Sequence, residues 1–124
     1  MNDSPVVLYG IPNCDRVRAA RRWLRERGVP HRFHDLRADG AGPELFARWL
    51  AQVGPARLIN RHSATWRALA EGERQQLAGP AAAEVLARHP TLAQRPVLEV
   101  GERLWVGFDP AAWAALLALE GGAT

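Results

Sequence analysis

The stretch Val6-Val-Leu-Tyr-Gly-Ile-Pro-Asn-Cys14 decides the fold, because it leads from an apolar run through one tight turn to the only cysteine of the chain. β-Branched and aromatic residues fill positions 6–9 and predict a short buried strand that ends at Gly10. The glycine, the proline and the asparagine that follow are typical of a turn. Cys14 is therefore expected at the start of whatever element comes next.

The next element is predicted to be a helix over residues 15–27, which Gly28 ends. One face of this helix is apolar, at Val17, Ala20 and Leu24. Residues 31–36 alternate loosely and predict a second strand. Two strands joined by a helix form a βαβ unit, so we expect a parallel pair with a right-handed crossover.

The middle of the chain is predicted to be helical. Pro43 opens a helix that Gly54 closes, and apolar residues recur in it at helical spacing, at Phe46, Trp49, Leu50 and Val53. Residues 56–88 predict short helical pieces that begin at Ser63 and Pro80. The last of them is expected to end at His89-Pro90, because the residue before a proline disfavours helix. No strand is expected in this part.

The last third predicts a hairpin and a helix. The strands cover residues 97–100 and 103–108, and Gly101-Glu102 between them suits a type II′ turn. Asp109 is a helix cap with Pro110 at the first helical position, and the helix is expected to end near Gly121. Its apolar side carries Trp113, Leu116 and Leu117.

The resulting order is β-α-β, a helical middle, then β-β-α. This is the order of an α/β thioredoxin-like fold with a four-stranded mixed sheet and a helical insertion, at about residues 43–90, between the two halves. The 124 residues, 48% of them apolar, fit one domain over positions 1–124.

Composition excludes several classes of site. With one cysteine the chain cannot form an internal disulfide or dithiol pair, so redox chemistry would need a thiol from elsewhere. The four histidines show no spacing typical of metal ligands, and no metal or bound cofactor is expected. No apolar run approaches the ~20 residues of a membrane helix, and no signal peptide is recognisable. We expect a soluble, cytoplasmic protein.

The cations are all arginines, yet 16 of them against 13 acids give a net charge of only +3. Direct nucleic-acid binding is therefore not expected. Six arginines gather between positions 16 and 27: Arg16, Arg18, Arg21, Arg22, Arg25 and Arg27. They form either a solvated helix face or a surface that attracts anions or acidic partners.

Cys14 is the candidate catalytic residue. At a helix start, unpaired backbone N–H groups and the helix dipole favour the thiolate, which is the nucleophilic form. Arg18 can add positive charge one turn further on, whereas Asp15 acts against it. The alternative is that Cys14 is a small buried hydrophobic residue without reactivity.

Pro96 stands at the entrance of the third strand, where thioredoxin-like folds place a cis proline facing the cysteine. Arg95 beside it is a candidate anion-binding residue or a plain surface arginine.

These residues resemble the arsenate reductase (ArsC) family, and within it the Spx/YffB-like branch. The resemblance rests on five segments in order: Leu8-Tyr-Gly-Ile-Pro-Asn-Cys14-Asp, Ala19-Ala-Arg-Arg-Trp-Leu24, Arg32-Phe-His-Asp35, Leu58-Ile-Asn-Arg-His-Ser-Ala-Thr-Trp66 and Gln94-Arg-Pro-Val97. It implies a thioredoxin-like domain in which Cys14 is the redox nucleophile. It also implies anion or glutathione binding by Asn13, Arg18, Arg61, Arg95 and Pro96.

Departures from the family pattern keep three functions open. Of the three arginines that arsenate reductases place around the oxyanion, Arg95 has a match, Asn60 replaces the second with Arg61 beside it, and nothing basic stands near Val106-Gly107. The resemblance implies a glutathione-dependent thiol reductase, with glutathione or a glutaredoxin as partner and a small anion, thiol or disulfide as substrate. The alternatives are an arsenate reductase and an Spx-like regulator that binds RNA polymerase, although the CxxC pair common in such regulators is absent.

Overall fold

The structure is a computed structural model that describes residues 6–121. The chain forms two compact units: one contains the chain up to Leu36 and from Arg95 onward, the other spans Arg37–Gln94. The second unit contains the segment predicted as a helical insertion. None of the helices within residues 6–121 is long and apolar enough to cross a membrane.

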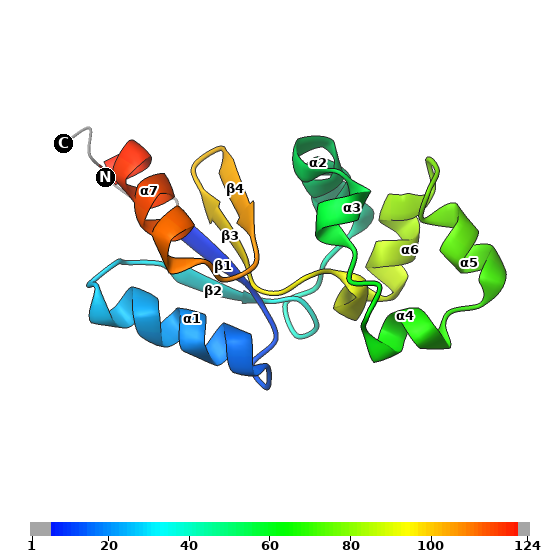
Figure 1. Cartoon of the computed structure of the whole chain (residues 1–124), viewed down its shortest axis with the longest axis horizontal. Helices are drawn as coiled ribbons and strands as arrows, with labels where there is room; N and C mark the ends of the chain where they lie inside the picture. The colour runs from blue at the N-terminus through cyan, green and yellow to red at the C-terminus, as the bar shows by residue number, and fades with distance from the viewer. Residues whose placement is uncertain (1–5, 122–124) are drawn as a thin grey trace. The chain divides into compact units, whose positions relative to one another are not determined.

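The first unit is a mixed sheet with two helices. Its elements are β1 (Val6–Gly10), α1 (Asp15–Glu26), β2 (Arg32–Asp35), β3 (Val97–Val100), β4 (Arg103–Val106) and α7 (Pro110–Gly121). The strand order is β2-β1-β3-β4, with β1 parallel to β2 and the other neighbours antiparallel (Figure 1). The predicted thioredoxin-like fold with a four-stranded mixed sheet is confirmed.

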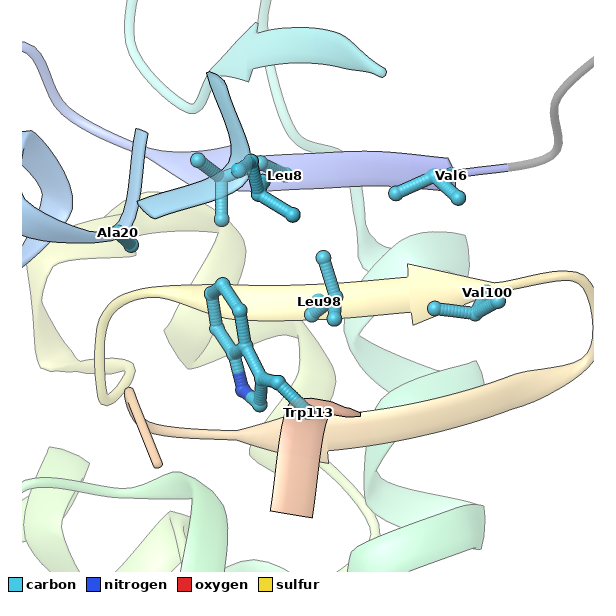
Figure 2. Packing of buried hydrophobic residues seen from close by; sticks show 7 residues of the cluster. Val6, Leu8, Ala20, Leu98, Val100 and Trp113 are labelled. Atoms are coloured by element: carbon cyan, nitrogen blue, oxygen red, sulfur yellow. The ribbon is translucent and has the colours of Figure 1, made fainter. Parts of the chain in front are cut away.

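Both helices of this unit pack on one face of the sheet. Residues that lie directly opposite each other on neighbouring strands point to the same face of the sheet, so Leu8 on β1 and its partner Leu98 on β3 share one face. They meet Ala20 of α1 and Trp113 of α7 in the buried core (Figure 2). The other core members are Val6, Leu24 and Val100. The apolar face predicted for α1 is therefore the face that covers the sheet.

The hairpin and the cap of α7 agree with the sequence patterns. Gly101 has φ +61°, the left-handed conformation that the predicted turn requires. The carboxylate of Asp109 accepts a hydrogen bond from the backbone N–H of Ala112 at 3.2 Å, so Asp109 is the cap. The second strand of the hairpin, β4, is predicted to reach Phe108 but ends at Val106, because Gly107 turns the chain at φ +92°.

The second unit consists of helices. They are α2 (Pro43–Val53), α3 (Pro55–Leu58), α4 (Ala64–Ala68), α5 (Glu71–Gln76), α6 (Ala82–Arg88) and the 3₁₀ turn η1 (Pro90–Leu92). α2 packs against α6, and it buries Phe46 and Trp49 with their rings edge to face at 5.5 Å. Ser63 caps α4 as predicted, since its Oγ accepts the backbone N–H of Trp66 at 3.1 Å.

Two details of this unit differ from the predictions. The helix expected to begin at Pro80 begins at Ala82, because Gly79-Pro80 forms a turn in which the carbonyl of Gly79 accepts the N–H of Ala82 at 3.2 Å. No extended strand forms, as expected, but a single antiparallel bridge joins Ile59 to Ala93.

Gly10 is required by close packing at the end of β1. A Cβ atom at this position would lie 2.6 Å from Cγ2 of Val17, which is fully buried in α1. We expect Gly10→Ala to destabilise the protein by about 1–3 kcal/mol, the usual cost of overpacking a rigid core. Urea unfolding measures it. Gly72→Ala is the control, because a Cβ atom at that position would have nothing within 4 Å. An equal free energy of unfolding in the two variants would contradict the close packing at Gly10.

Glu73 gives the second unit a pH-dependent contact. Its carboxylate meets Nε2 of His89 at 3.1 Å and an Arg88 nitrogen at 3.2 Å, and these hydrogen bonds lower the pKa of Glu73 below the ordinary 4.5. A lowered folded-state pKa stabilises above the unfolded value and the contribution disappears as pH falls through the folded value. The stability difference between wild type and Glu73→Gln should therefore shrink in acid, below about pH 4.5. Glu71→Gln on the same helix is the control, and a difference independent of pH would contradict the assignment.

Candidate active site around Cys14

Cys14 is the N-cap residue of α1. Its backbone is extended, at φ −110° and ψ 127°, and its carbonyl accepts the N–H of Arg18 at 2.9 Å. The side chain makes no capping hydrogen bond, and the residue is a half-buried free cysteine. The first backbone N–H groups of a helix have no partner within the helix, so they and the helix dipole favour negative charge on a group held at this end.

Arg18 is held by the loop that precedes the cysteine. Its guanidinium forms an ion pair with Asp15 and donates to the carbonyl of Pro12 at 3.4 Å. Arg18 and Asp15, whose charges have opposing effects on the thiol, form this ion pair with each other. Both side chains are exposed, so solvent weakens the field of the pair further.

Arg95 and Pro96 lie at the end of β1 that leads to Cys14. Tyr9 of β1 pairs with Val97 of β3, so Pro96 stands one position further, beside the end of β1. The Arg95-Pro96 peptide bond is cis, as expected, and Pro96 is buried, with its carbonyl accepting the N–H of Gly107 at 2.8 Å. Arg95 is half-buried and its Nε is shielded from solvent.

The other predicted binding residues occupy separate places. Asn13 is exposed next to Cys14 in the loop. Arg61 belongs to the second unit, where its guanidinium lies 5.6 Å from the ring centroid of Trp66. Its role at Cys14 stays a prediction. Asn60 beside it is occupied by the local turn, because its side-chain oxygen accepts the N–H of His62 at 2.9 Å.

A polar group on the sheet was not predicted from the sequence. The hydroxyl of Tyr9 donates to the carboxylate of Glu99 at 2.9 Å, and the Tyr9 ring lies 4.9 Å from the ring of His34. Tyr9 alternates with Leu8 along β1, so this group lies on the face opposite to the helices. The signal that could have revealed it is the single acidic residue within the apolar strand Val97–Val100.

Metal binding finds no support in the part of the chain that the structure describes. Across residues 6–121, no three side chains among histidine, cysteine, aspartate and glutamate gather in a way that could hold an ion.

The structure combines a thioredoxin-like sheet with the only cysteine at the start of the first helix and a cis proline beside the neighbouring strand. Comparison with known families gives the particular one. The profile of the ArsC family matches residues 9–116, which is most of the chain. The protein belongs to the ArsC family.

Known proteins place the chain within this family. A solved structure described as a YffB protein is 43% identical and superposes with a TM-score of 0.85, covering 91% of this chain and 99% of its own. An arsenate reductase related protein from Brucella melitensis is 37% identical, with a TM-score of 0.72 and coverage of 93% and 96%.

Two curated relatives complete the comparison. An uncharacterized protein from Haemophilus influenzae is 35% identical over 113 residues, which are 91% of this chain and 99% of the relative. The global transcriptional regulator Spx of Listeria innocua is 26% identical over 106 residues, covering 84% of this chain and 80% of the regulator. The recognition of the family from its five segments is thereby confirmed.

Proposed function

We propose that the protein is a cytoplasmic, glutathione-dependent thiol reductase in which Cys14 is the nucleophile. The observation that supports this most is the position of Cys14: it is half-buried, it is the N-cap of α1, and its side chain is not used as a cap. A cysteine with a structural role would be expected inside the apolar core, which Cys14 is not part of.

The proposed reaction needs two thiol–disulfide exchanges. The Cys14 thiolate attacks the glutathione sulfur of a glutathione mixed disulfide, an S–S bond forms between Cys14 and glutathione, and the substrate sulfur leaves as a thiolate that takes up a proton. The thiolate of a second glutathione then attacks the glutathione sulfur on Cys14, the S–S bond to Cys14 breaks, and glutathione disulfide leaves while Cys14 returns to its thiolate. The two electrons that reduce the substrate disulfide come from the two glutathione sulfurs, so the lone cysteine requires no internal partner.

Arg95 is the proposed binding residue for a carboxylate of glutathione. The β1–β3 register brings the Arg95-Pro96 pair to the same end of β1 as the loop to Cys14. A guanidinium can bind a carboxylate through two parallel hydrogen bonds. Asn13, exposed beside the cysteine, is the proposed neutral partner in the same site.

Arsenate reduction is the second candidate function. The Brucella relative is described as related to arsenate reductase, and the family carries that name. Asn60, which stands at the second arginine position of those reductases, is occupied by its bond to the N–H of His62. We therefore favour a sulfur substrate over an oxyanion, since an anion held by fewer guanidinium groups loses charge-assisted hydrogen bonds.

A regulatory role like that of the Spx relatives is the third candidate. It differs from the proposed reductase in its need for the thiol. A regulator that acts by binding RNA polymerase would retain that binding in a Cys14→Ser variant, while a thiol reductase would lose its activity. Recovery of RNA polymerase equally by wild type and variant would favour the regulatory function.

Oxidised glutathione tests the proposed function directly. Incubation should add one glutathione to the protein, visible in the intact mass, and peptide mapping should place it on Cys14. Reduced glutathione or glutaredoxin should then remove it. A protein that gains no adduct, or keeps it in the presence of excess reduced glutathione, would refute the reductase proposal. A second incubation with arsenate and glutathione distinguishes the arsenate reductase, which would release arsenite.

Arg95→Ala is expected to weaken the interaction with glutathione about tenfold to a hundredfold, because one charge-assisted contact contributes about 1.5–3 kcal/mol. The rate of adduct formation at increasing glutathione disulfide concentration measures this. Arg95→Lys keeps the charge and checks that any loss does not come from unfolding. Arg103→Ala is the matched control, because Arg103 pairs with Val100 at the opposite end of β3. Equal losses in both alanine variants would contradict a specific role for Arg95.

A further inference from the structure

Helix α1, whose place in the fold Figure 1 shows, has four arginines that share one side by their spacing in the sequence. At 3.6 residues per turn, neighbouring residues are about 100° apart, and four of the arginines fall within an arc of about 100°. We call this set the α1 arginine face; its members are Arg18, Arg21, Arg22 and Arg25. Arg16, about 180° round the helix from Arg25, lies outside it.

Two members of the face are anchored and two are available. Arg18 is paired with Asp15, and the Arg21 guanidinium lies 4.3 Å from the ring centroid of Phe33. Arg22 and Arg25 are exposed, and within residues 6–121 neither side chain forms a hydrogen bond, an ion pair or a ring contact. The guanidinium group offers donors in a planar fork that matches a carboxylate.

We propose that the α1 arginine face docks an acidic segment of a protein that carries a glutathione mixed disulfide, and so brings a sulfur of that disulfide to Cys14. This inference rests on the proposed reductase function and names the kind of partner. The face begins one turn from the cysteine, since the N–H of Arg18 bonds to the carbonyl of Cys14 at 2.9 Å. From Arg18 to Arg25 it extends about 10 Å, which three or four residues of an extended peptide can span.

An acidic protein segment fits this face better than a nucleic acid does. The net charge of the chain is only +3, whereas nucleic-acid binding domains carry a dominant basic charge. Asp15 and Glu26 stand at the two ends of α1, on the side of the helix next to the face. A phosphate backbone that continues past either end would meet these carboxylates, while a short acidic segment ends before them.

Two synthetic peptides test the inference. Each carries one cysteine, two glycines and then four identical residues, which are glutamates in one peptide and glutamines in the other. The cysteine is activated as a mixed disulfide with pyridine-2-thiol. The Cys14 thiolate attacks the peptide sulfur, the existing S–S bond breaks, and pyridine-2-thiolate leaves with the electron pair. This anion takes up a proton to give pyridine-2-thione, whose absorbance reports the rate.

At low salt we expect the glutamate peptide to react about threefold to tenfold faster than the glutamine peptide, and salt to remove the difference. Arg25→Gln should lower the preference, and Arg22→Gln/Arg25→Gln should abolish it. Arg16→Gln is the charge-matched control, because it removes one exposed arginine from the opposite side of the same helix, and it should keep most of the preference. Equal rates for the two peptides with the wild type, or equal losses in Arg16→Gln and Arg25→Gln, would overturn the inference.

The small neutral reagent 2,2′-dithiodipyridine separates this inference from the proposed function. If Cys14 fails to react with it in the folded protein, the reductase proposal fails. If Cys14 reacts with it but shows no preference for glutamate, only the docking surface fails. A labelled DNA duplex that binds the wild type more tightly than the glutamate peptide does, and loses affinity in the double variant, would assign the face to nucleic acid and overturn the inference.

Discussion

Cys14→Ser is expected to lower the rate of the glutathione-coupled reduction of a glutathionylated peptide by a factor of a thousand or more. A serine hydroxyl does not attack a disulfide at neutral pH and cannot form one with glutathione. Consumption of reduced glutathione, coupled to glutathione reductase, measures the rate. The exchange of sulfur for oxygen at a half-buried N-cap should leave the fold intact, and serine is a favourable residue at that position. Retained turnover in this variant would assign the activity to another group.

Trp113→Ala is expected to lower the free energy of unfolding by about 3–5 kcal/mol, as large-to-small changes of a buried tryptophan do. Trp113 is fully buried, its ring lies edge to face with Phe108 at 5.0 Å and Trp23 at 5.9 Å, and its indole N–H donates to the carbonyl of Gly107 at 3.0 Å. It is the fully buried member that α7 contributes to the core cluster of the first unit, and Leu116 and Leu117 of the same helix pack against that cluster.

Urea unfolding, followed by circular dichroism, measures this loss. Trp113→Phe keeps a ring but removes the donor to Gly107, so its stability should lie between those of the wild type and the alanine variant. Leu119→Ala on the same helix is the control, because Leu119 is 60% exposed and its replacement should cost less than about 0.5 kcal/mol. A similar loss in Leu119→Ala and Trp113→Ala would contradict the packing described.

The elements that local chemistry determines could be predicted from the sequence. Helix α2 begins at Pro43 and ends at Val53 before Gly54, the cap of α7 is Asp109, and Gly101 forms the hairpin turn. Each of these signals acts within a few residues. Pro43 has a fixed φ, the Asp109 side chain accepts a backbone N–H, and Gly101 adopts a positive φ. Tertiary contacts are not needed to recognise them.

The short helices α3 and α5 could not be predicted in the same way. They have four and six residues, too few to be stable alone, and the residue before α5, Ala70, provides no side-chain cap. Such helices form because the surrounding unit packs them, and that packing is not visible in a local pattern. The start of α6 at Ala82 instead of Pro80 also depends on contacts that a local pattern does not show. Pro80 lies within the turn in which the carbonyl of Gly79 accepts the N–H of Ala82.

For the candidate site, the sequence predicted the residues better than their contacts. Cys14 was expected at a helix start, and it is the N-cap of α1. The pairing of Tyr9 with Val97, which brings Pro96 to the end of β1, depends on strands that are almost ninety residues apart, and only the thioredoxin-like order of the elements indicated it. The partner of Arg18 is a matter of side-chain geometry, and the structure shows that it is Asp15.

The claim that the fold makes Cys14 a nucleophile is tested most directly by its reaction rate with 2,2′-dithiodipyridine in the folded and the urea-unfolded protein at the same pH below neutrality. The start of a helix contributes about 0.3–1 kcal/mol to a negative charge, so Cys14 should react about twofold to fivefold faster in the folded protein. Glutathione, measured in the same two solutions, corrects for the effect of urea on the reagent. A folded protein that reacts at the same rate as the unfolded chain, or more slowly, would contradict the account.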